Sequence, residues 1–379
     1  MFESRTAKGI PTAVLPGSTD KAQALPTPAV VVHWPTVENN VQYMAQRATQ
    51  FGVQLRPHIK THKNLEVAEL QMNTGAAGLT CAKVSEAEVF VDAGFEDIFL
   101  AYPVVGEHQI AQVMAMAKRC RMSVAFDSIE GATRLQAGAA EAQLELDVML
   151  IVDTGGGRDG VATAEEAEEL ALAVQGMKNL RLAGLMTHEG HAYKTGSEAG
   201  VRQTARTIGG VIVQVAEHLR SLGITVERVS SGATPTCWLE EPVPGINEWR
   251  PGTYVYNDIQ EWSLGIPEDH CAVTVEATIV SHPQSQRYIM DAGAKTLSQA
   301  QHPVYGYGLI IGHEKARIVG LTEEHGTIEA PPDTLAIGQR ISIVPIHVCT
   351  TVNMHSTLWK WNGQGSCEPL RVHARGCVV

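Results

Sequence analysis

Basic residues alternate with other residues in the run Arg56-Pro57-His58-Ile59-Lys60-Thr61-His62-Lys63, the most informative stretch of the chain. In a β-strand alternate side chains share a face, so a strand over residues 54–60 would point Arg56, His58 and Lys60 the same way. Basic groups on one face are difficult to bury unless an anion or a cofactor offsets their charge. An exposed strand edge is the plainer interpretation. The functional interpretation is a lysine in the mouth of a barrel, where its amine acts as a nucleophile.

Two segments rich in glycine and hydroxyl groups follow predicted strands further along the chain. Ser231-Gly232-Ala233-Thr234 offers backbone N–H groups and hydroxyls of the kind that cradle a phosphate. Gly252-Thr253-Tyr254 adds a second place where the backbone can approach a ligand closely. Either segment alone is compatible with an ordinary turn. Together, at the end of a barrel, they predict a phosphate site.

Two other strand ends carry residues that suit a cofactor or a substrate. The glycine-rich turn at 153–161 contains Arg158, whose guanidinium can bind a carboxylate by charge-assisted hydrogen bonds. The segment 187–193 contains His188, which can orient a ring, and Tyr193, whose hydroxyl can hold a ring or a substrate. A plain tight turn at 153–161 and a histidine satisfied within the core at 188 are the alternatives.

His347 and Cys349 are two positions apart in a segment predicted to be a strand, so both side chains would face the same way. An imidazole and a thiolate suit Zn²⁺ or a similar divalent ion. With so few protein ligands, open coordination positions would remain for substrate oxygens, as at a catalytic metal. Chance burial of the two residues is the alternative.

Short apolar strands alternate with helical patterns from about residue 27 to 260, which is typical of βα units. We expect roughly eight strands there, at residues 29–33, 54–60, 78–82, 97–102, 123–127, 147–153, 182–188 and 226–231. An open doubly wound sheet fits this pattern too. Chemically useful residues end strand after strand, however, which favours a closed (β/α)8 barrel of the TIM type.

After about residue 265, strands follow one another with little helix between them, which predicts a second, mostly β domain. We therefore expect an α/β protein with three parts. Residues 1–26 form an N-terminal arm that packs on the β domain, residues 27–264 form the barrel, and residues 265–379 form the β domain that carries the metal pair.

Three segments together resemble the fold-type III pyridoxal-phosphate enzymes, whose barrel is like the alanine racemase N-terminal domain. They are the strand that opens with Thr27-Pro28, the lysine run, and Ala82-Lys83-Val84-Ser85-Glu86-Ala87. The similar branch contains D-serine dehydratase, D-threonine aldolase and D-threo-3-hydroxyaspartate dehydratase, and the resemblance covers nearly the whole chain. It implies that Lys60 carries pyridoxal 5′-phosphate covalently.

The resemblance also implies roles for the other residues. The expected catalytic residues are Lys60, His188 and Arg158, and the expected ligands of a zinc or manganese ion are His347 and Cys349. The expected cofactor-binding residues are Lys60, His58, Arg158, His188, Tyr193, Ser231, Gly232, Ala233, Thr234, Gly252, Thr253 and Tyr254. One position departs from the family pattern, because D-threonine aldolases of known motif place a catalytic histidine where this chain has Glu189.

The composition limits the classes of partner and location. A net charge of −12 argues against nucleic acid or an anionic membrane surface as a partner. No apolar run approaches the roughly 20 residues that span a bilayer, and the first residues lack the apolar core of a secretory signal. The 7 cysteines, odd in number and without a C-x-x-C pair, favour a reducing cytoplasm.

The sequence and the resemblance together predict a lyase that acts on D-3-hydroxy amino acids of the D-serine or D-threonine type. Dehydration is favoured, and retro-aldol cleavage to glycine and an aldehyde is the alternative. An amino-acid racemase of the same fold and a cofactor-carrier protein are further alternatives. The resemblance also implies a homodimer, because family active sites combine the barrel of one subunit with the second domain of the other.

Overall fold

The computed structural model describes residues 25–379, and the chain divides into two compact units. The first unit is residues 41–254 together with 376–379, and the second is the described residues up to 40 together with 255–375. One boundary therefore falls inside helix α1 (Trp34–Gln50), between residues 40 and 41, and another falls between residues 254 and 255, whereas boundaries after residues 26 and 264 were expected. The expected N-terminal arm, residues 1–26, lies almost entirely outside the described residues.

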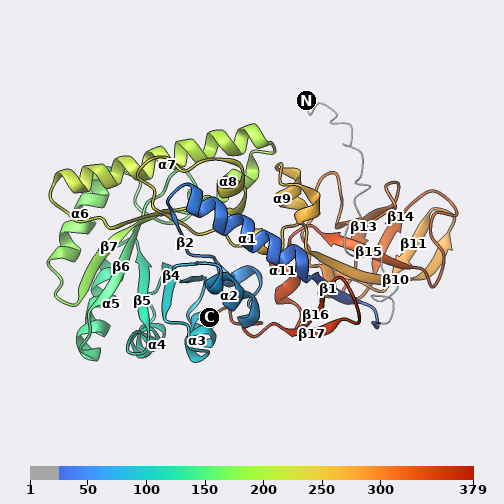
Figure 1. Ribbon diagram of the computed structural model, residues 1–379, viewed down its shortest axis with the longest axis horizontal. Helices are drawn as coiled ribbons and strands as arrows, with labels where there is room; N and C mark the ends of the chain where they lie inside the picture. Colours follow the sequence, from blue (N-terminus) through green and yellow to red (C-terminus); the bar gives the residue numbers. More distant parts are fainter. Residues whose placement is uncertain (1–24) are drawn as a thin grey trace. The chain divides into compact units, whose positions relative to one another are not determined.

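The first unit is a parallel barrel with helices between its strands (Figure 1). Its strands are β2 (Gln54–Leu55), β3 (Leu79–Cys81), β4 (Asp97–Pro103), β5 (Arg121–Phe126), β6 (Leu146–Ile151), β7 (Leu180–Met186), β8 (Arg228–Ser231) and β9 (Glu248–Trp249). They form an 8-stranded sheet in the order β2-β9-β8-β7-β6-β5-β4-β3, and a parallel bridge between His58 and Thr80 joins its two ends. The predicted (β/α)8 barrel is confirmed.

The helices of the barrel unit connect successive strands. They are α2 (Leu65–Asn73), α3 (Val84–Asp92), α4 (Glu107–Ala117), α5 (Ile129–Ala142), α6 (Ala164–Gln175), α7 (Glu198–Ser221) and α8 (Thr234–Leu239), with 3-10 turns η2 (Ile59–Thr61), η3 (Gly190–Lys194) and η4 (Thr253–Val255). Ser128, Thr163 and Ser197 each accept a hydrogen bond from a backbone N–H in the first turn of the helix that follows. These caps satisfy donors that a helix start leaves free, so they fix where α5, α6 and α7 begin.

Large and small apolar side chains fill the interior of the barrel. The buried cluster consists of Phe99, Ala101, Ala125, Met149, Ile151, Ala183 and Met186. Because this cluster fills the inside and helices cover the outside, the barrel strands are apolar on both faces. This explains why they read as continuous apolar runs in the sequence.

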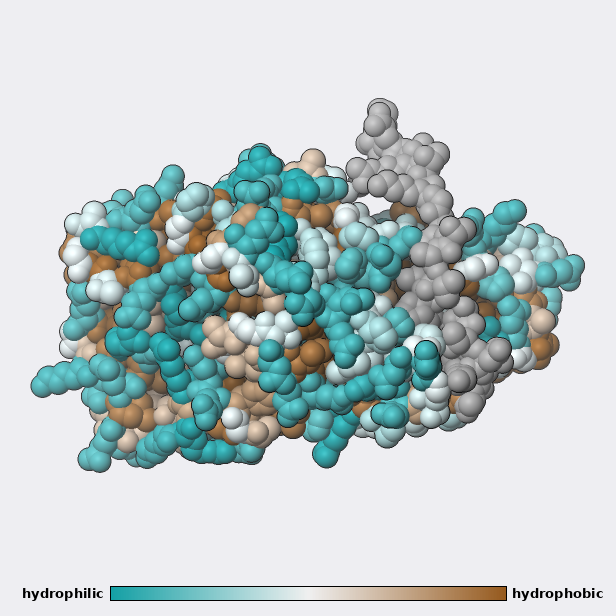
Figure 2. Space-filling view, in the orientation of Figure 1, coloured by the Kyte–Doolittle hydropathy of each residue, from teal (hydrophilic) through white to brown (hydrophobic). Residues whose placement is uncertain are grey.

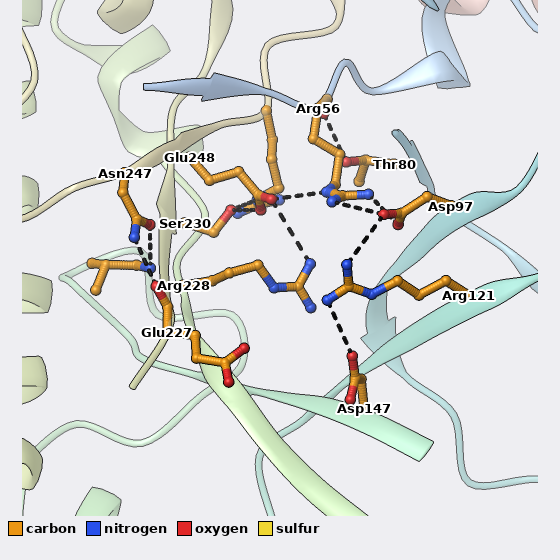
Figure 3. Close-up of polar contacts among 12 residues, drawn as sticks. Arg56, Thr80, Asp97, Arg121, Asp147, Glu227, Arg228, Ser230, Asn247 and Glu248 are labelled. Atoms are coloured by element: carbon orange, nitrogen blue, oxygen red, sulfur yellow. Dashed lines mark hydrogen bonds and ion pairs between the residues drawn. The ribbon is translucent and has the colours of Figure 1, made fainter. Parts of the chain in front are cut away.

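Charged side chains form a network at the amino-terminal ends of the barrel strands (Figure 3). The Arg56 guanidinium lies 2.5 Å from Asp97 and 2.8 Å from Glu248. Arg228 lies 3.8 Å from the same Glu248 carboxylate. Two guanidinium groups beside it hold the pKa of Glu248 below its usual range, although burial alone would raise it. The charge of Arg56 is thus neutralised inside the fold, and the prediction that it shares a face with Lys60 is wrong.

Replacing Glu248 with glutamine is expected to lower the free energy of unfolding by about 3–5 kcal/mol, because it leaves buried guanidinium charge uncompensated. Urea unfolding followed by circular dichroism measures this. The matched control is Asp92→Asn, which breaks the exposed ion pair with Arg119 and should cost about 1 kcal/mol or less. Equal effects of the two substitutions would contradict a stabilising role for the buried network.

The second unit is mostly β, as predicted (Figure 1). Its sheet contains β1 (Ala29–His33), β10 (Val273–Gln284), β11 (Arg287–Met290), β12 (Gly308–Ile310), β13 (Arg317–Leu321), β14 (Gly326–Glu329), β15 (Arg340–Pro345), β16 (Thr357–Trp361) and β17 (Glu368–Arg371). The helical turns are α9 (Ile259–Ser263), η5 (Glu268–His270), α10 (Ala294–Leu297) and α11 (Val348–Asn353). The strand order is β13-β14-β11-β10-β1-β16-β17, with β15 pairing β10 and β12.

Two strands differ from the sequence prediction. The strand at 29–33 was expected to open the barrel, but β1 pairs antiparallel with β10 and parallel with β16 in the second unit. The barrel obtains its remaining strand from β9, a segment that the apolar pattern does not reveal. The reason is that a fully buried apolar strand looks the same in either sheet, whereas its partners are distant in sequence.

The surface carries mixed side chains. Hydrophilic residues are scattered over the face shown in Figure 2, with hydrophobic residues between them. Among residues 25–379, no helix has the length and apolar character that a membrane span needs.

Candidate active site

The lysine run begins at the carboxyl-terminal end of β2 and turns at once. Strand β2 ends at Leu55, and Lys60 lies in η2 with its side chain exposed. The expected strand over 54–60 is therefore too long, because Pro57 has no N–H to donate to a sheet. The backbone N–H of His58 donates to the carbonyl of Pro251 at 2.9 Å. This bond ties the lysine turn to the segment that follows β9.

Gly252 lies close against the lysine turn. A Cβ atom at this position would lie 2.8 Å from the carbonyl oxygen of His58. Only glycine fits such an approach without moving the turn. The close backbone approach predicted at this glycine is made to the protein's own lysine turn.

The other basic groups of the run have separate partners. His62 contacts the backbone of Asn64 at 3.1 Å through Nδ1. Lys63 lies 2.9 Å from the buried carboxylate of Glu86 and donates to the carbonyl of Cys377 at 3.0 Å. The basic groups of the run therefore do not gather on one face. Lys60 is the member whose amine is exposed at the carboxyl-terminal end of the barrel.

Two histidines and several cations surround the exposed lysine amine. Burial, and then the charges of Lys60, Arg250 and His188, lower the pKa of His58 well below its usual value. Burial, and then the charges of Arg250, Arg158 and Lys60, lower the pKa of His188 to about 2. Both rings are therefore neutral. Within residues 25–379, His58 Nδ1 and His188 Nε2 are buried without a hydrogen-bond partner.

Arg250 is the cation of this cluster that the sequence analysis did not select. Its guanidinium is 4% exposed, donates to Ser230 Oγ at 2.8 Å, and lies 5.5 Å above the ring of Phe99. Arg250 directly follows β9. Because the sequence did not predict β9, it did not place Arg250 at the end of a barrel strand. Its place directly before Pro251-Gly252 was the signal that could have found it.

The glycine-rich turn after β6 forms hydrogen bonds to an aspartate of the same turn. The Asp153 carboxylate accepts from the backbone N–H groups of Gly155, Gly156 and Gly157 at 2.9, 2.7 and 3.1 Å. These hydrogen bonds lower the pKa of Asp153 despite the opposing effect of its burial. The turn therefore has the structure of a tight turn, the alternative considered above. The Arg158 side chain is exposed and lies 3.2 Å from Asp159.

The predicted phosphate segment at residues 231–234 also forms hydrogen bonds to a carboxylate of the protein. Glu189 accepts hydrogen bonds from the hydroxyls of Ser231 and Thr236, from Gly232 N–H at 2.9 Å, and from Ala233 N–H at 3.1 Å. The carboxylate is 6% exposed. It fills the position in which the sequence analysis expected a phosphate.

The remaining predicted ligand-contact residues lie beside this loop or follow it. Thr234 Oγ1 accepts from the Tyr254 N–H at 2.9 Å, which joins the two predicted phosphate segments. The Tyr254 side chain is fully buried, and its hydroxyl accepts from Gln71 at 2.9 Å. Thr253 is also buried, whereas Tyr193 is half-buried in η3.

His347 and Cys349 lie in the second unit, at the start of α11. His347 is the residue before the first turn, so the predicted strand is wrong at this point. Its Nδ1 lies 3.3 Å from a carboxylate oxygen of Asp258, which also accepts from Val348 N–H at 2.9 Å. Burial opposes a charge on the ring, but the Cys349 sulfur and Asp258 raise the pKa of His347 to about 11.

The donors of this pair suit a divalent metal. A carboxylate that holds one nitrogen of a histidine, while the other nitrogen binds the ion, is a common arrangement in metal sites. Here Asp258 is the carboxylate, and Cys349 supplies the sulfur beside the ring. Within the part of the chain that the structure describes, no group of three or more His, Cys, Asp or Glu residues is arranged to hold a metal.

The fold and the site define a barrel enzyme of the alanine racemase type. Residues 32–260 match the family described as alanine racemase, N-terminal domain, and residues 272–359 match a putative serine dehydratase domain. The chain therefore belongs to the fold-type III pyridoxal-phosphate family, in the branch of the D-serine dehydratases and D-threonine aldolases. The predicted resemblance is confirmed, and the protein is a pyridoxal-phosphate-dependent lyase.

Individual relatives match along most of the chain. D-threo-3-hydroxyaspartate dehydratase of Delftia sp. (strain HT23) is 31% identical over 88% of this chain and 93% of its own length. D-threonine aldolase of Arthrobacter sp. is also 31% identical, over 92% of each chain. A solved structure of a D-threo-3-hydroxyaspartate dehydratase variant, with a cysteine replaced by alanine and in the metal-free form, has a TM-score of 0.86 at 30% identity. It covers 93% of this chain and 99% of that one.

The residues present fit this cofactor. An exposed lysine amine lies at the carboxyl-terminal end of the barrel, where TIM-type barrels place their active sites. Cations surround it, and buried ring nitrogens of His58 and His188 are left without a hydrogen-bond partner among residues 25–379. Positive charge and unsatisfied buried nitrogens are features that an anionic, aromatic ligand would satisfy.

Proposed function

We propose that the protein eliminates water from D-3-hydroxy amino acids, and that the released product takes up water again to give a 2-oxo acid and ammonia, with pyridoxal 5′-phosphate on Lys60 and a divalent metal at His347 and Cys349. The observation that carries this proposal is the exposed Lys60 amine among cations at the carboxyl-terminal end of the barrel. The metal pair supports the lyase rather than the racemase or carrier alternatives, because those activities have no use for a Lewis acid.

Each residue has one proposed role. The cofactor, when bound, withdraws electrons from the α-carbon of the amino acid. Lys60 Nζ holds the cofactor and, once free, takes the α-proton of the substrate. His188 and His58 remain neutral, so they orient the cofactor ring through hydrogen bonds and packing rather than through charge. Arg158, exposed and paired only loosely with Asp159, would bind the substrate carboxylate.

The metal pair is proposed to act on the β-hydroxyl. His347 and Cys349 would hold a zinc or manganese ion, with Asp258 fixing the imidazole. A divalent ion makes hydroxide a better leaving group. A solved structure of a D-threo-3-hydroxyaspartate dehydratase variant is described as a metal-free form, which supports a metal site in this branch of the family. A homodimer is part of the proposal by family resemblance, and a cytoplasmic location is part of it because the 7 cysteines form no C-x-x-C pair. Sedimentation velocity tests the dimer.

Dehydration is favoured over cleavage because cleavage needs a base for the β-hydroxyl proton. Glu189 stands where the resemblance places the aldolase histidine, and its carboxylate already accepts four hydrogen bonds. One observation favours cleavage as the second candidate. His191 Nδ1 is buried without a hydrogen-bond partner within residues 25–379, so this ring could take that proton.

Incubation with D-threonine separates the two reactions. Dehydration converts D-threonine to 2-oxobutanoate and ammonia, whereas cleavage gives glycine and acetaldehyde. We expect 2-oxobutanoate as the main product, measured by chromatography of the reaction mixture, with L-threonine as the stereochemical control. Glycine with an equal amount of acetaldehyde would show that the reaction is cleavage and not dehydration. Formation of L-allo-threonine alone, the product of inversion at the α-carbon, would establish a racemase.

A further inference from the structure

Glu189 occupies a cup built from the loop between β8 and α8. Each of its carboxylate oxygens accepts one hydroxyl and one backbone N–H: Ser231 and Gly232 donate to Oε1, and Thr236 and Ala233 donate to Oε2. An ionised carboxylate is an acceptor-only group with room for four such bonds. The cup and its occupant therefore match in number and in kind, and the carboxylate is buried.

The shape of the cup depends on Gly232. This residue has a φ of +107°, and a Cβ atom there would lie 2.5 Å from Cys237 Sγ. With that conformation the N–H groups of Gly232 and Ala233 both point to Glu189. Charge-assisted hydrogen bonds of this kind are roughly twice as strong as neutral ones. The carboxylate of Glu189, a residue that follows β7 in the chain, thus holds the loop in place.

The same loop is joined to the lysine turn. Arg250 N–H donates to the carbonyl of Ser231 at 3.0 Å, and Thr234 Oγ1 accepts from Tyr254 N–H at 2.9 Å. The Pro251 carbonyl in this segment accepts from His58 N–H at 2.9 Å. Glu189, the loop and the lysine turn are therefore connected by successive hydrogen bonds.

We propose that Glu189 is a positioning residue that holds the 231–236 loop in the conformation that binds the phosphate of the cofactor, and that it is not displaced by that phosphate. The inference rests on the proposed function. It implies that the phosphate binds donors beside the cup, on Thr234 and in the 252–254 segment, since those of Gly232 and Ala233 stay on Glu189.

Glu189→Gln tests this inference, because an amide offers one acceptor oxygen and an NH2 group that must face a backbone N–H. We expect the Kd of the apoprotein for pyridoxal 5′-phosphate to rise about tenfold or more. The Kd for pyridoxal, which lacks the phosphate, should change by less than about twofold. Absorbance titration of the apoprotein measures both constants. Glu240→Gln is the control: its carboxylate binds Arg206 outside the cup, so both constants should be unchanged.

The other outcomes overturn the inference. Tighter binding of the phosphorylated cofactor by Glu189→Gln would make Glu189 a competitor for the phosphate site. An equal rise in the Kd values for pyridoxal 5′-phosphate and for pyridoxal would show that Glu189 has only a structural role. If Glu189→Gln does not fold, Thr236→Val removes one hydroxyl donor of the cup and should shift the same ratio of constants in the same direction. If the wild-type protein binds neither ligand, the proposed function fails, and not only the role of Glu189.

Discussion

Lys60→Arg is expected to reduce turnover at least about a thousand-fold, because a guanidinium cannot form the covalent cofactor link or act as a base near neutral pH. The variant keeps the positive charge at an exposed position, so the fold should be retained. It should also lose the cofactor absorbance near the visible edge that borohydride bleaches in the wild-type protein. Steady-state kinetics and absorption spectra of the purified variant measure both effects.

Peptide mapping provides the control for this prediction. Borohydride reduction of the wild-type protein should fix the cofactor on Lys60 and leave Lys63 unlabelled, because the Lys63 amine is buried against Glu86. A label on Lys63, or full turnover by Lys60→Arg, would remove the basis of the proposed function.

Removing the divalent metal with a chelator is expected to reduce lyase turnover at least about a hundred-fold, and zinc or manganese should restore it. His347→Ala and Cys349→Ala should show the same loss without rescue. Asp258→Asn should weaken metal affinity about 10- to 100-fold, because the imidazole loses the carboxylate that orients it. Metal content by mass spectrometry and turnover at varied metal concentration measure these effects.

Cys367→Ala is the matched control, since Cys367 is a half-buried free cysteine of the same unit outside the metal pair. It should keep metal content and turnover. The cofactor absorbance of the chelated enzyme should also remain, which separates metal loss from cofactor loss. Full lyase turnover by the metal-free enzyme would instead contradict the proposed role of the metal pair.

Sequence alone was sufficient for features that depend on neighbouring residues. The alternation of apolar strands and helices predicted the barrel, and the later run of strands predicted the β domain. Cap residues such as Ser197 begin helices for a local reason, the hydrogen bond to their own first turn. The proposals for Lys60 and for the pair His347 and Cys349 also rest on local patterns: a specific motif for the lysine, and residue types at a spacing that suits a metal for the pair.

Only the tertiary structure decided which groups are partners. β1 lies in the sheet of the second unit, and the unpredicted strand β9 completes the barrel, because strand pairing joins segments far apart in sequence. Arg56 pairs with Glu248, which is 192 residues away in the chain, and does not share a face with Lys60. The N–H groups of Gly232 and Ala233, which were predicted to bind a ligand, donate hydrogen bonds to the Glu189 carboxylate. Apolar periodicity and turn chemistry act over a few residues, whereas the partner of a buried charge or donor is set by the folded arrangement of the whole unit.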